Sequence, residues 1–198
     1  MPFISTIARE DAAASSSTKD DYLNPTNVKS GSKVRFTLLD EEPFMFYELW
    51  GHEVNDPERR KPFRFLEEPT PEDIEQKLGE DYVRSLSRDG KAPESCRIGH
   101  AVPVYNYDLE RVQVLSWTQK TITQQFDVIS QLEDYADSMT ECDFYLSREG
   151  QGTDTKYTVQ AAPKKKAMAK AVEEAWDAEK EFDLKRLLKG GNPFKEEE

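Results

Sequence analysis

The strongest constraint on the fold is a pair of predicted β-hairpins in the second half of the chain, separated by a single predicted helix. Apolar and polar side chains alternate along each strand, and turn-forming residues separate the strands, which is typical of antiparallel hairpins. Between the hairpins, Thr118 is a suitable N-cap for a helix that ends near Leu132. The four predicted strands cover residues 100–105, 111–117, 142–148 and 156–159.

Three further strands are predicted upstream, at residues 33–39, 44–50 and 61–65. Pro62 lacks an amide hydrogen, so the third of these strands is expected at a sheet edge. Short strands with one helix before the last hairpin indicate a mainly β chain with flanking helices, of the α+β class. Within that class, the order favours an OB-like antiparallel five-stranded barrel.

The sequence divides into segments of different composition. A linker-like run of small residues at 12–18 predicts a flexible N-terminal arm. An acidic, helical insertion interrupts the barrel, with a surface helix expected at 69–87, and an acidic tail ends the chain. The predicted parts are an arm at 1–30, an OB-like domain at 31–163 with its insertion at 66–98, a C-terminal helix at 164–189 and the tail at 190–198.

Charge is unevenly distributed along the chain. The 198 residues include 27 Lys and Arg and 39 Asp and Glu, a net charge of −12 that taken alone argues against nucleic-acid binding. The insertion, the terminal helix, acidic turns and the tail carry much of the acid. Two basic clusters remain, one at 59–64 and one at 164–166, so cations gathered on one face are still compatible with binding to phosphates.

Several functional classes find little support in the sequence. There is no membrane-length apolar run, no secretory signal pattern and no phosphate-binding or nucleophile-elbow motif. Two cysteines cannot form a disulfide framework, which favours a reducing, cytoplasmic location. A zinc site would require Cys96, His100, Cys142 and His52 to converge. We therefore expect no catalytic activity, no metal, no cofactor and no membrane partner.

Aromatic residues interleaved with cations are the pattern most informative about function. Proteins that bind single strands without sequence preference stack bases on aromatic rings and track phosphates with cations. On the first hairpin, Tyr105, Tyr107 and Trp117 have the parity opposite to the valines. If the valines face the core, these aromatics face outward; the alternative is that both faces of the hairpin are covered.

The hairpin–helix–hairpin region is similar to a known protein family. The segments PVYNYDLERVQVLSWTQKTI, CDFYLSREGQGTDTKYTV and PKKK, with KVRFTLLDEEPFMFYELWG and RKPFRF upstream, resemble single-stranded-DNA-binding proteins of tailed bacteriophages. The resemblance covers roughly residues 31–65 and 99–166. It implies an OB fold that coats single-stranded DNA in replication, recombination and repair, in the host cytoplasm. It also implies an acidic tail that contacts replication or recombination proteins and competes with DNA.

The predicted interface combines the residues that match the family with the aromatic and basic residues around them. The predicted nucleic-acid-binding residues are Arg35, Trp50, Arg59, Arg60, Lys61, Phe63, Arg64, Tyr105, Tyr107, Arg111, Trp117, Lys120, Arg148 and Lys156. The predicted partner-binding tail residues are Phe194, Glu196, Glu197 and Glu198. The chain departs from the family in its acidic insertion and in ending on three glutamates rather than an aromatic residue.

Two other functions fit parts of the sequence. The acidic surface and the helices also suit an interaction protein that binds a host or virion protein. The abundant carboxylates suit, more weakly, a metal-dependent nuclease. The sequence does not specify the oligomeric state, and a dimer is compatible with it.

Overall fold

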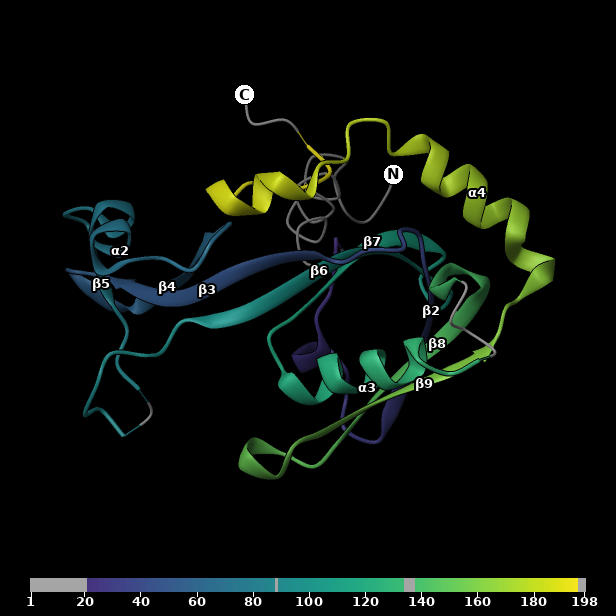
Figure 1. Cartoon of the computed structure of the whole chain (residues 1–198), viewed down its shortest axis with the longest axis horizontal. Coiled ribbons are helices and arrows are strands. Elements are labelled where there is room, and N and C mark those ends of the chain that lie inside the picture. The colour runs from purple at the N-terminus through teal and green to yellow at the C-terminus, as the bar shows by residue number, and fades with distance from the viewer. Residues whose placement is uncertain (1–20, 88, 134–137, 196–198) are drawn as a thin grey trace, which may run out of the picture. The chain divides into compact units, whose positions relative to one another are not determined.

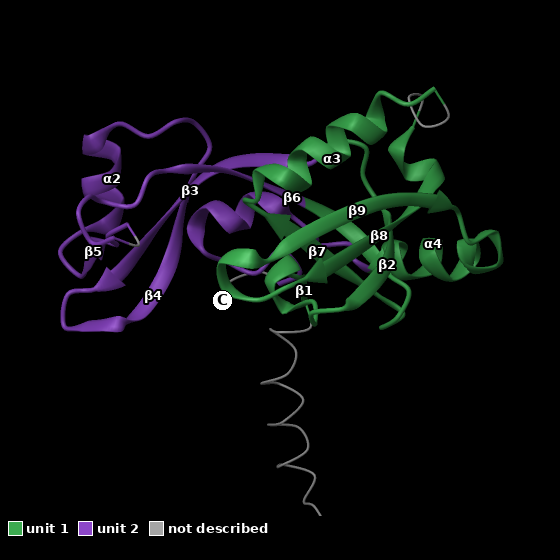
Figure 2. Ribbon diagram, turned by 90° about the horizontal axis from the view of Figure 1, so that it is seen from below, with its two compact units in different colours: residues 1–42, 102–178 green, residues 43–101, 179–198 purple. Residues whose placement is uncertain are grey.

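The structure, a computed structural model, describes residues 21–87, 89–133 and 138–195. These residues divide into two compact units (Figure 2). Unit 1 combines residues of 1–42 with 102–178, and unit 2 combines 43–101 with residues of 179–198. Each unit therefore contains two separate stretches of the sequence.

Unit 1 is built on an open sheet in the order β1-β7-β6-β2-β8-β9 (Figure 1). The pairings of β2 with β6, β2 with β8 and β8 with β9 are antiparallel, and that of β1 with β7 is parallel. Among the described residues, β1 and β9 are edge strands with one neighbour each. The strands are β1 (Tyr22–Leu23), β2 (Ser32–Leu38), β6 (Arg97–Asn106, of which Val102–Asn106 lie in this unit), β7 (Arg111–Trp117), β8 (Cys142–Glu149) and β9 (Lys156–Pro163).

Strict alternation in β2 explains where the core of unit 1 forms. Val34, Phe36 and Leu38 contribute to one apolar cluster, whereas Lys33 and Arg35 point to the other face. Helix α3 (Lys120–Ser130) completes the cluster through Ile122, Phe126 and Ile129. The remaining members come from most of the other strands of the sheet, and include Leu23, Val102, Val104, Leu115, Trp117, Phe144, Leu146 and Val159.

Unit 2 is a smaller sheet whose central strand is β3 (Phe44–Glu53). It pairs with β4 (Asp56–Phe65) on one edge, and with β5 (Tyr82–Arg84) and the first half of β6 on the other. Helix α2 (Pro71–Leu78) packs on one face, where Ile74 and Leu78 join Leu49 and Phe63 in a second apolar cluster. Among the described pairings β4 has β3 as its only partner, so the predicted edge position of Pro62 is confirmed.

Short helices connect and flank these elements. Helix α4 (Ala169–Ala178) follows β9 and contacts β7. The 3-10 segment η5 (Leu184–Lys189) contacts β4 in unit 2 and buries Leu187. The other 3-10 segments are η1 (Pro25–Asn27), η2 (Met139–Glu141), η3 (Gly152–Asp154) and η4 (Lys166–Met168).

The predicted α+β class, the strands and the helix before the last hairpin are confirmed. The prediction of one helix at 69–87 is wrong: α2 ends at Leu78 because Gly79, at φ +63°, caps it. Tyr82 still packs against the same apolar cluster, but from β5. Periodicity thus identified its burial and not its secondary structure.

Two expectations for the chain ends also require correction. The predicted helix at 164–189 is split, because Asp183 begins a new segment by accepting a hydrogen bond from the Lys185 amide at 2.9 Å. Within the predicted arm, residues 21–30 form β1 and η1, and Leu23 and Val28 are buried in the core. Residues 1–20 lie outside the described residues.

Gly99 on β6 gives a direct test of packing in unit 2. A Cβ at this position would lie 2.7 Å from Cζ of the fully buried Phe46. We expect Gly99→Ala to lower the free energy of unfolding by about 1–3 kcal/mol, because the added methyl group would force the buried ring to shift. Urea unfolding followed by tryptophan fluorescence measures this. The neighbouring Ile98, 49% exposed, is the control: Ile98→Ala should stay within about 0.5 kcal/mol. If Gly99→Ala and Ile98→Ala had the same free energy of unfolding, the close packing of Gly99 against Phe46 would be contradicted.

Candidate nucleic-acid interface

The outer face of strands β2, β8 and β9 in unit 1 forms the first candidate surface, named here the Tyr145 face. The register places Arg35 opposite Tyr145, and Tyr145 opposite Gln160. Directly paired residues project from the same side of a sheet, so these side chains share the face that points away from the core. The Tyr145 face comprises Lys33, Arg35, Tyr145, Ser147, Thr158 and Gln160.

Two cations flank the half-buried ring of Tyr145. The Lys33 ammonium lies 4.4 Å from the ring centroid and the Arg35 guanidinium 5.4 Å from it. Lys33 is exposed, and none of the ion pairs between described residues involves it. The face therefore offers an aromatic surface next to a cation that is not neutralised by a carboxylate.

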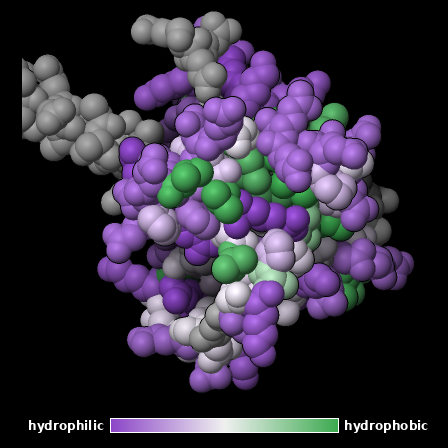
Figure 3. All heavy atoms as spheres, turned by 90° about the vertical axis from the view of Figure 1, so that its left-hand side faces the viewer, coloured by the Kyte–Doolittle hydropathy of each residue, from purple (hydrophilic) through white to green (hydrophobic). Residues whose placement is uncertain are grey.

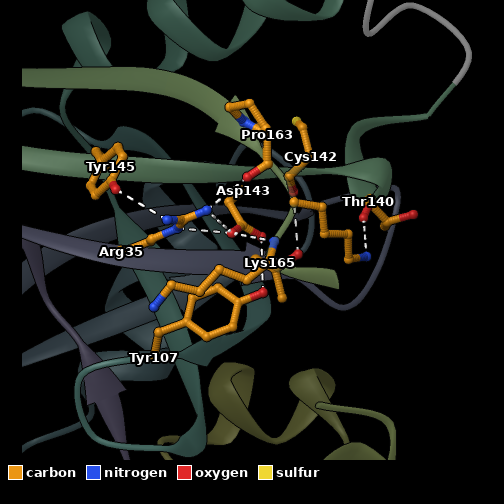
Figure 4. A network of polar contacts seen from close by, with 10 residues as sticks. Arg35, Tyr107, Thr140, Cys142, Asp143, Tyr145, Pro163 and Lys165 are labelled. Carbon is orange, nitrogen blue, oxygen red and sulfur yellow. Dashed lines mark hydrogen bonds and ion pairs between the residues drawn. The ribbon is translucent and has the colours of Figure 1, made fainter. Parts of the chain in front are cut away.

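Asp143, fully buried at the end of this face, organises the second cation (Figure 4). Its carboxylate accepts hydrogen bonds from Arg35 Nε at 2.9 Å, the Tyr107 hydroxyl at 2.9 Å and the Lys165 amide at 3.1 Å. The pKa of the Tyr107 hydroxyl is raised, mainly because the hydroxyl is buried. Its hydrogen bond to Asp143 and the negative charge of Asp143 raise this pKa further. Tyr107 therefore stays protonated as a donor.

Arg35 is consequently held in place by several partners. Besides its 2.7 Å ion pair with Asp143, it donates to the Tyr145 hydroxyl at 3.3 Å and to the Pro163 carbonyl at 2.7 Å. Its side chain is only 19% exposed. We assign Arg35 the role of fixing the Tyr145 ring, rather than that of a mobile contact to phosphate.

A second candidate surface, named here the Trp50 face, lies on the sheet of unit 2. Leu49 points towards α2, so its neighbours Glu48 and Trp50 point to the opposite face. The register adds Arg60 and Arg64 from β4. From β6 it adds Arg97, which is paired with Glu48. The Trp50 face comprises Glu48, Trp50, Arg60, Arg64 and Arg97.

Acidic groups balance most of the cations on the Trp50 face. Arg64 pairs with Glu48 at 2.9 Å and lies over the ring of Phe46. Glu94 pairs with both Arg60 at 3.3 Å and Arg97 at 2.9 Å. Arg60 also lies 5.7 Å from the ring of the half-buried Trp50. The face is thus aromatic and arginine-rich, but less cationic than the cluster at 59–64 suggests.

Strand alternation separates the rest of that basic cluster from the Trp50 face. Lys61 and Phe63 lie on the α2 side, with the Lys61 ammonium 3.8 Å from the ring of Tyr82. Arg59 pairs with Glu53 at 3.3 Å near the β3–β4 turn. The structure therefore divides a continuous basic sequence among three environments.

The prediction that the aromatics of the β6–β7 hairpin face outward is wrong. Tyr105, Tyr107 and Trp117 are 2%, 6% and 5% exposed. Trp117 belongs to the core, where its indole donates to Thr123 at 3.0 Å. Both faces of the hairpin are buried, and α4 packs on β7. The covered-hairpin alternative is the correct one, and these rings are inaccessible for stacking.

The remaining predicted residues differ in availability. Arg111 pairs with Asp21 at 3.0 Å. Arg148 donates to the carbonyls of Thr26 and Val28 and so ties β8 to η1. Lys120 and Lys156 are exposed, at the start of α3 and of β9.

The predicted tail is described only in part. Phe194 packs against Phe182 with ring centroids 5.1 Å apart, so it contributes to unit 2. Glu196, Glu197 and Glu198 lie outside the described residues.

Sequence reasoning missed Lys33, Tyr145 and Arg97. Lys33 and Tyr145 lie within strands that the sequence predicts, but only the register of β2 with β8 shows that they share a face. Arg97 was assigned to the acidic insertion, although it begins β6. Parity within each strand was available from the sequence; the pairing between strands was not.

Neither the described residues nor the comparisons with known proteins assign a metal site, a membrane span or a family. Among the described residues, no three His, Cys, Asp or Glu side chains are grouped to hold a metal ion. Within the same part of the chain, no helix has the length and apolar character needed to cross a membrane. No protein-family model, no curated protein and no solved structure matches the chain.

Proposed function

We propose that the protein binds single-stranded DNA with little sequence preference, through an OB-like unit 1. Five strands follow the order β7-β6-β2-β8-β9, with α3 between β7 and β8. This order is a three-strand meander extended by a second hairpin, as in an OB-like Greek-key sheet. The sheet is open, which is compatible with the partly open barrels of that fold.

The observation that carries the proposal is the Tyr145 face. A half-buried aromatic ring lies beside an exposed Lys33 that forms no ion pair with the described residues. Together they offer a base a surface to stack on and a phosphate a cation. Each stacked base contributes roughly 1–3 kcal/mol without sequence preference. The uncharged polar side chains of Ser147, Thr158 and Gln160 complete a face that does not repel phosphates.

Unit 2 supports the same proposal independently. In OB folds the connection between the first two strands is one of the loops that bind oligonucleotides. Here the connection from β2 to β6 is expanded into most of unit 2, which carries the Trp50 face. We assign this face a second stacking role, weaker in phosphate attraction because Glu48 and Glu94 neutralise its arginines.

The resemblance to phage proteins extends the proposal to a biological role. In that role the protein coats single strands during phage DNA replication, recombination and repair, without catalytic activity. Its C-terminal residues contact replication or recombination proteins, and the protein acts in the cytoplasm of the host.

Oligo-dT titrations at several salt concentrations test the proposal. We expect micromolar or tighter binding that weakens as salt increases. Tyr145→Ala should weaken it by roughly 1–3 kcal/mol, because one stacking surface is lost. Lys33→Ala should reduce the salt slope by at most about 0.7, the contribution of one single-strand phosphate contact. Fluorescence anisotropy with a labelled oligonucleotide measures both.

Three further variants make the test specific. Tyr145→Phe keeps the ring and should retain binding. Lys170→Ala removes an equal charge from α4, where Lys170 pairs with Glu174, and should leave the slope unchanged. Trp50→Ala tests whether the Trp50 face of unit 2 also contributes to the affinity for oligo-dT. No binding by the unaltered protein in low salt, or equal binding by Tyr145→Ala, would contradict the proposal.

A further inference from the structure

Unit 2 contains a groove that neither candidate interface uses, named here the Leu66 groove. It has a volume of about 650 Å³, within the range of ligand-binding clefts. It lies between the end of β4, the loop that follows it, helix α2 and η5. Its lining residues are Phe65, Leu66, Glu67, Glu68, Pro69, Thr70, Asp73, Gln76, Lys77 and Leu188.

The groove has an apolar part that remains accessible. Leu66 is 58% exposed, more than most apolar side chains of the described chain, and Phe65, Pro69 and Leu188 are only partly buried. Figure 3 shows hydrophobic residues exposed among hydrophilic ones on the face that it views. An accessible leucine beside partly buried apolar groups gives an incoming side chain something to pack against.

The walls of the groove are held by specific contacts. The capping box of α2 fixes Thr70 and Asp73, which exchange hydrogen bonds at 2.8 Å and 3.2 Å. The Lys77 ammonium lies 4.5 Å from the ring of Phe65 and donates to the Arg64 carbonyl. The groove therefore exists before a ligand arrives, and its one lysine is already engaged.

The rim of the groove is acidic. Glu67 and Glu68 are exposed next to Leu66, and Asp73 also lines the groove. None of the ion pairs between described residues involves these three carboxylates. Their charge repels nucleic-acid phosphates and attracts cations, so this surface favours a different occupant from the Tyr145 face.

We propose that the Leu66 groove binds a basic amphipathic segment of another protein. Apolar side chains of that segment would pack on Leu66 and Phe65, while its lysines or arginines would face Glu67 and Glu68. Recognition of this kind combines apolar anchors with charge complementarity at the rim. The inference does not depend on DNA binding, because no residue of the groove belongs to either candidate nucleic-acid surface.

The full-length protein tests this with two labelled peptides, one of alternating leucine and lysine pairs and one with glutamate in place of lysine. We expect the lysine peptide to bind and the glutamate peptide not to bind. Leu66→Asp should weaken binding of the lysine peptide about tenfold or more, because an apolar anchor is lost. The double variant Glu67→Lys and Glu68→Lys should remove the preference for the lysine peptide.

Leu109→Asp in the β6–β7 turn is the matched control, since Leu109 is also about half exposed, at 53%. It should bind the lysine peptide as the unaltered protein does. Equal binding of both peptides, or equal loss in Leu66→Asp and Leu109→Asp, would overturn the proposal. So would self-association in sedimentation that Leu66→Asp abolishes, because a second copy would then occupy the groove. Oligo-dT affinity, measured in parallel, should be unchanged by Leu66→Asp.

Discussion

Replacing Asp143 with alanine is expected to lower the free energy of unfolding by about 3–5 kcal/mol, because it leaves a largely buried guanidinium without its partner. Asp143 is fully buried and receives hydrogen bonds from three separate segments of unit 1, through Arg35, Tyr107 and the Lys165 amide. Removing the carboxylate takes away the acceptor for the Tyr107 hydroxyl, the Lys165 amide and Arg35 Nε, and leaves Arg35 only the neutral acceptors of Tyr145 and Pro163. Urea unfolding of the variant and the unaltered protein measures the difference.

Two other variants separate charge from packing. The double variant Arg35→Met and Asp143→Leu removes both charges and should be less destabilised than Asp143→Ala alone, since no buried ion is left unpaired. Glu149→Ala changes an exposed acid at the end of the same strand, and should stay within about 0.5 kcal/mol. If Asp143→Ala and Glu149→Ala have the same stability, the Asp143 network does not hold unit 1 together.

The next residue along β8 gives the second large effect, on the opposite face of the sheet. Phe144 is fully buried, stacked on Phe36 at 5.7 Å and edge-on to Phe126 at 5.4 Å. We expect Phe144→Ala to cost about 3–5 kcal/mol, because it removes a large apolar side chain and leaves a cavity between the sheet and α3. Phe144→Leu keeps most of the volume and should cost less.

Tyr145→Ala is the matched control for this prediction. Its ring is half-buried on the outer face, so its loss should destabilise unit 1 less than Phe144→Ala does. Thermal unfolding of the three variants, with oligo-dT affinity measured well below each transition, distinguishes folding from binding. Phe144→Ala should retain oligo-dT affinity where it is folded, whereas Tyr145→Ala should bind more weakly. If Phe144→Ala weakened oligo-dT binding and Tyr145→Ala did not, the assignment of the core face and the binding face of the sheet would be wrong.

Sequence periodicity predicted the strands of this fold well, and it failed where tertiary packing decides. The strand at 111–117 has the bounds that alternation predicts. Strand β4 begins five residues before the predicted strand, because pairing with β3 extends it through polar residues. In the helix predicted at 69–87, apolar residues four apart continued past Gly79, whose positive φ ends the helix. Apolar residues that recur every four positions can therefore be buried without belonging to one helix.

The candidate site was predictable only in part. Aromatic and basic composition indicated a binding surface, and Trp50, Arg60 and Arg64 do share a face. The neighbouring Lys61 and Phe63 do not, since alternate residues of a strand point to opposite sides. Tyr105 and Tyr107 were misassigned because parity alone cannot reveal that the outer face of the hairpin is covered. Trp117 was misassigned because on β7 it is Leu115 and Trp117 that face the core. Tyr145 and Lys33 became visible as a pair only through strand register.

The way the chain alternates between the two units has a consequence for the order in which they form during synthesis. All described parts of unit 1 precede residue 179, whereas unit 2 also needs residues that the ribosome adds after that point. Leu187, 2% exposed, belongs to that late stretch, and η5 contacts β4. Unit 1 is therefore complete while the sheet of unit 2 still lacks η5, and domains generally fold as units in chain order. Truncation from residue 179 therefore removes part of unit 2 and leaves the described sequence of unit 1 intact.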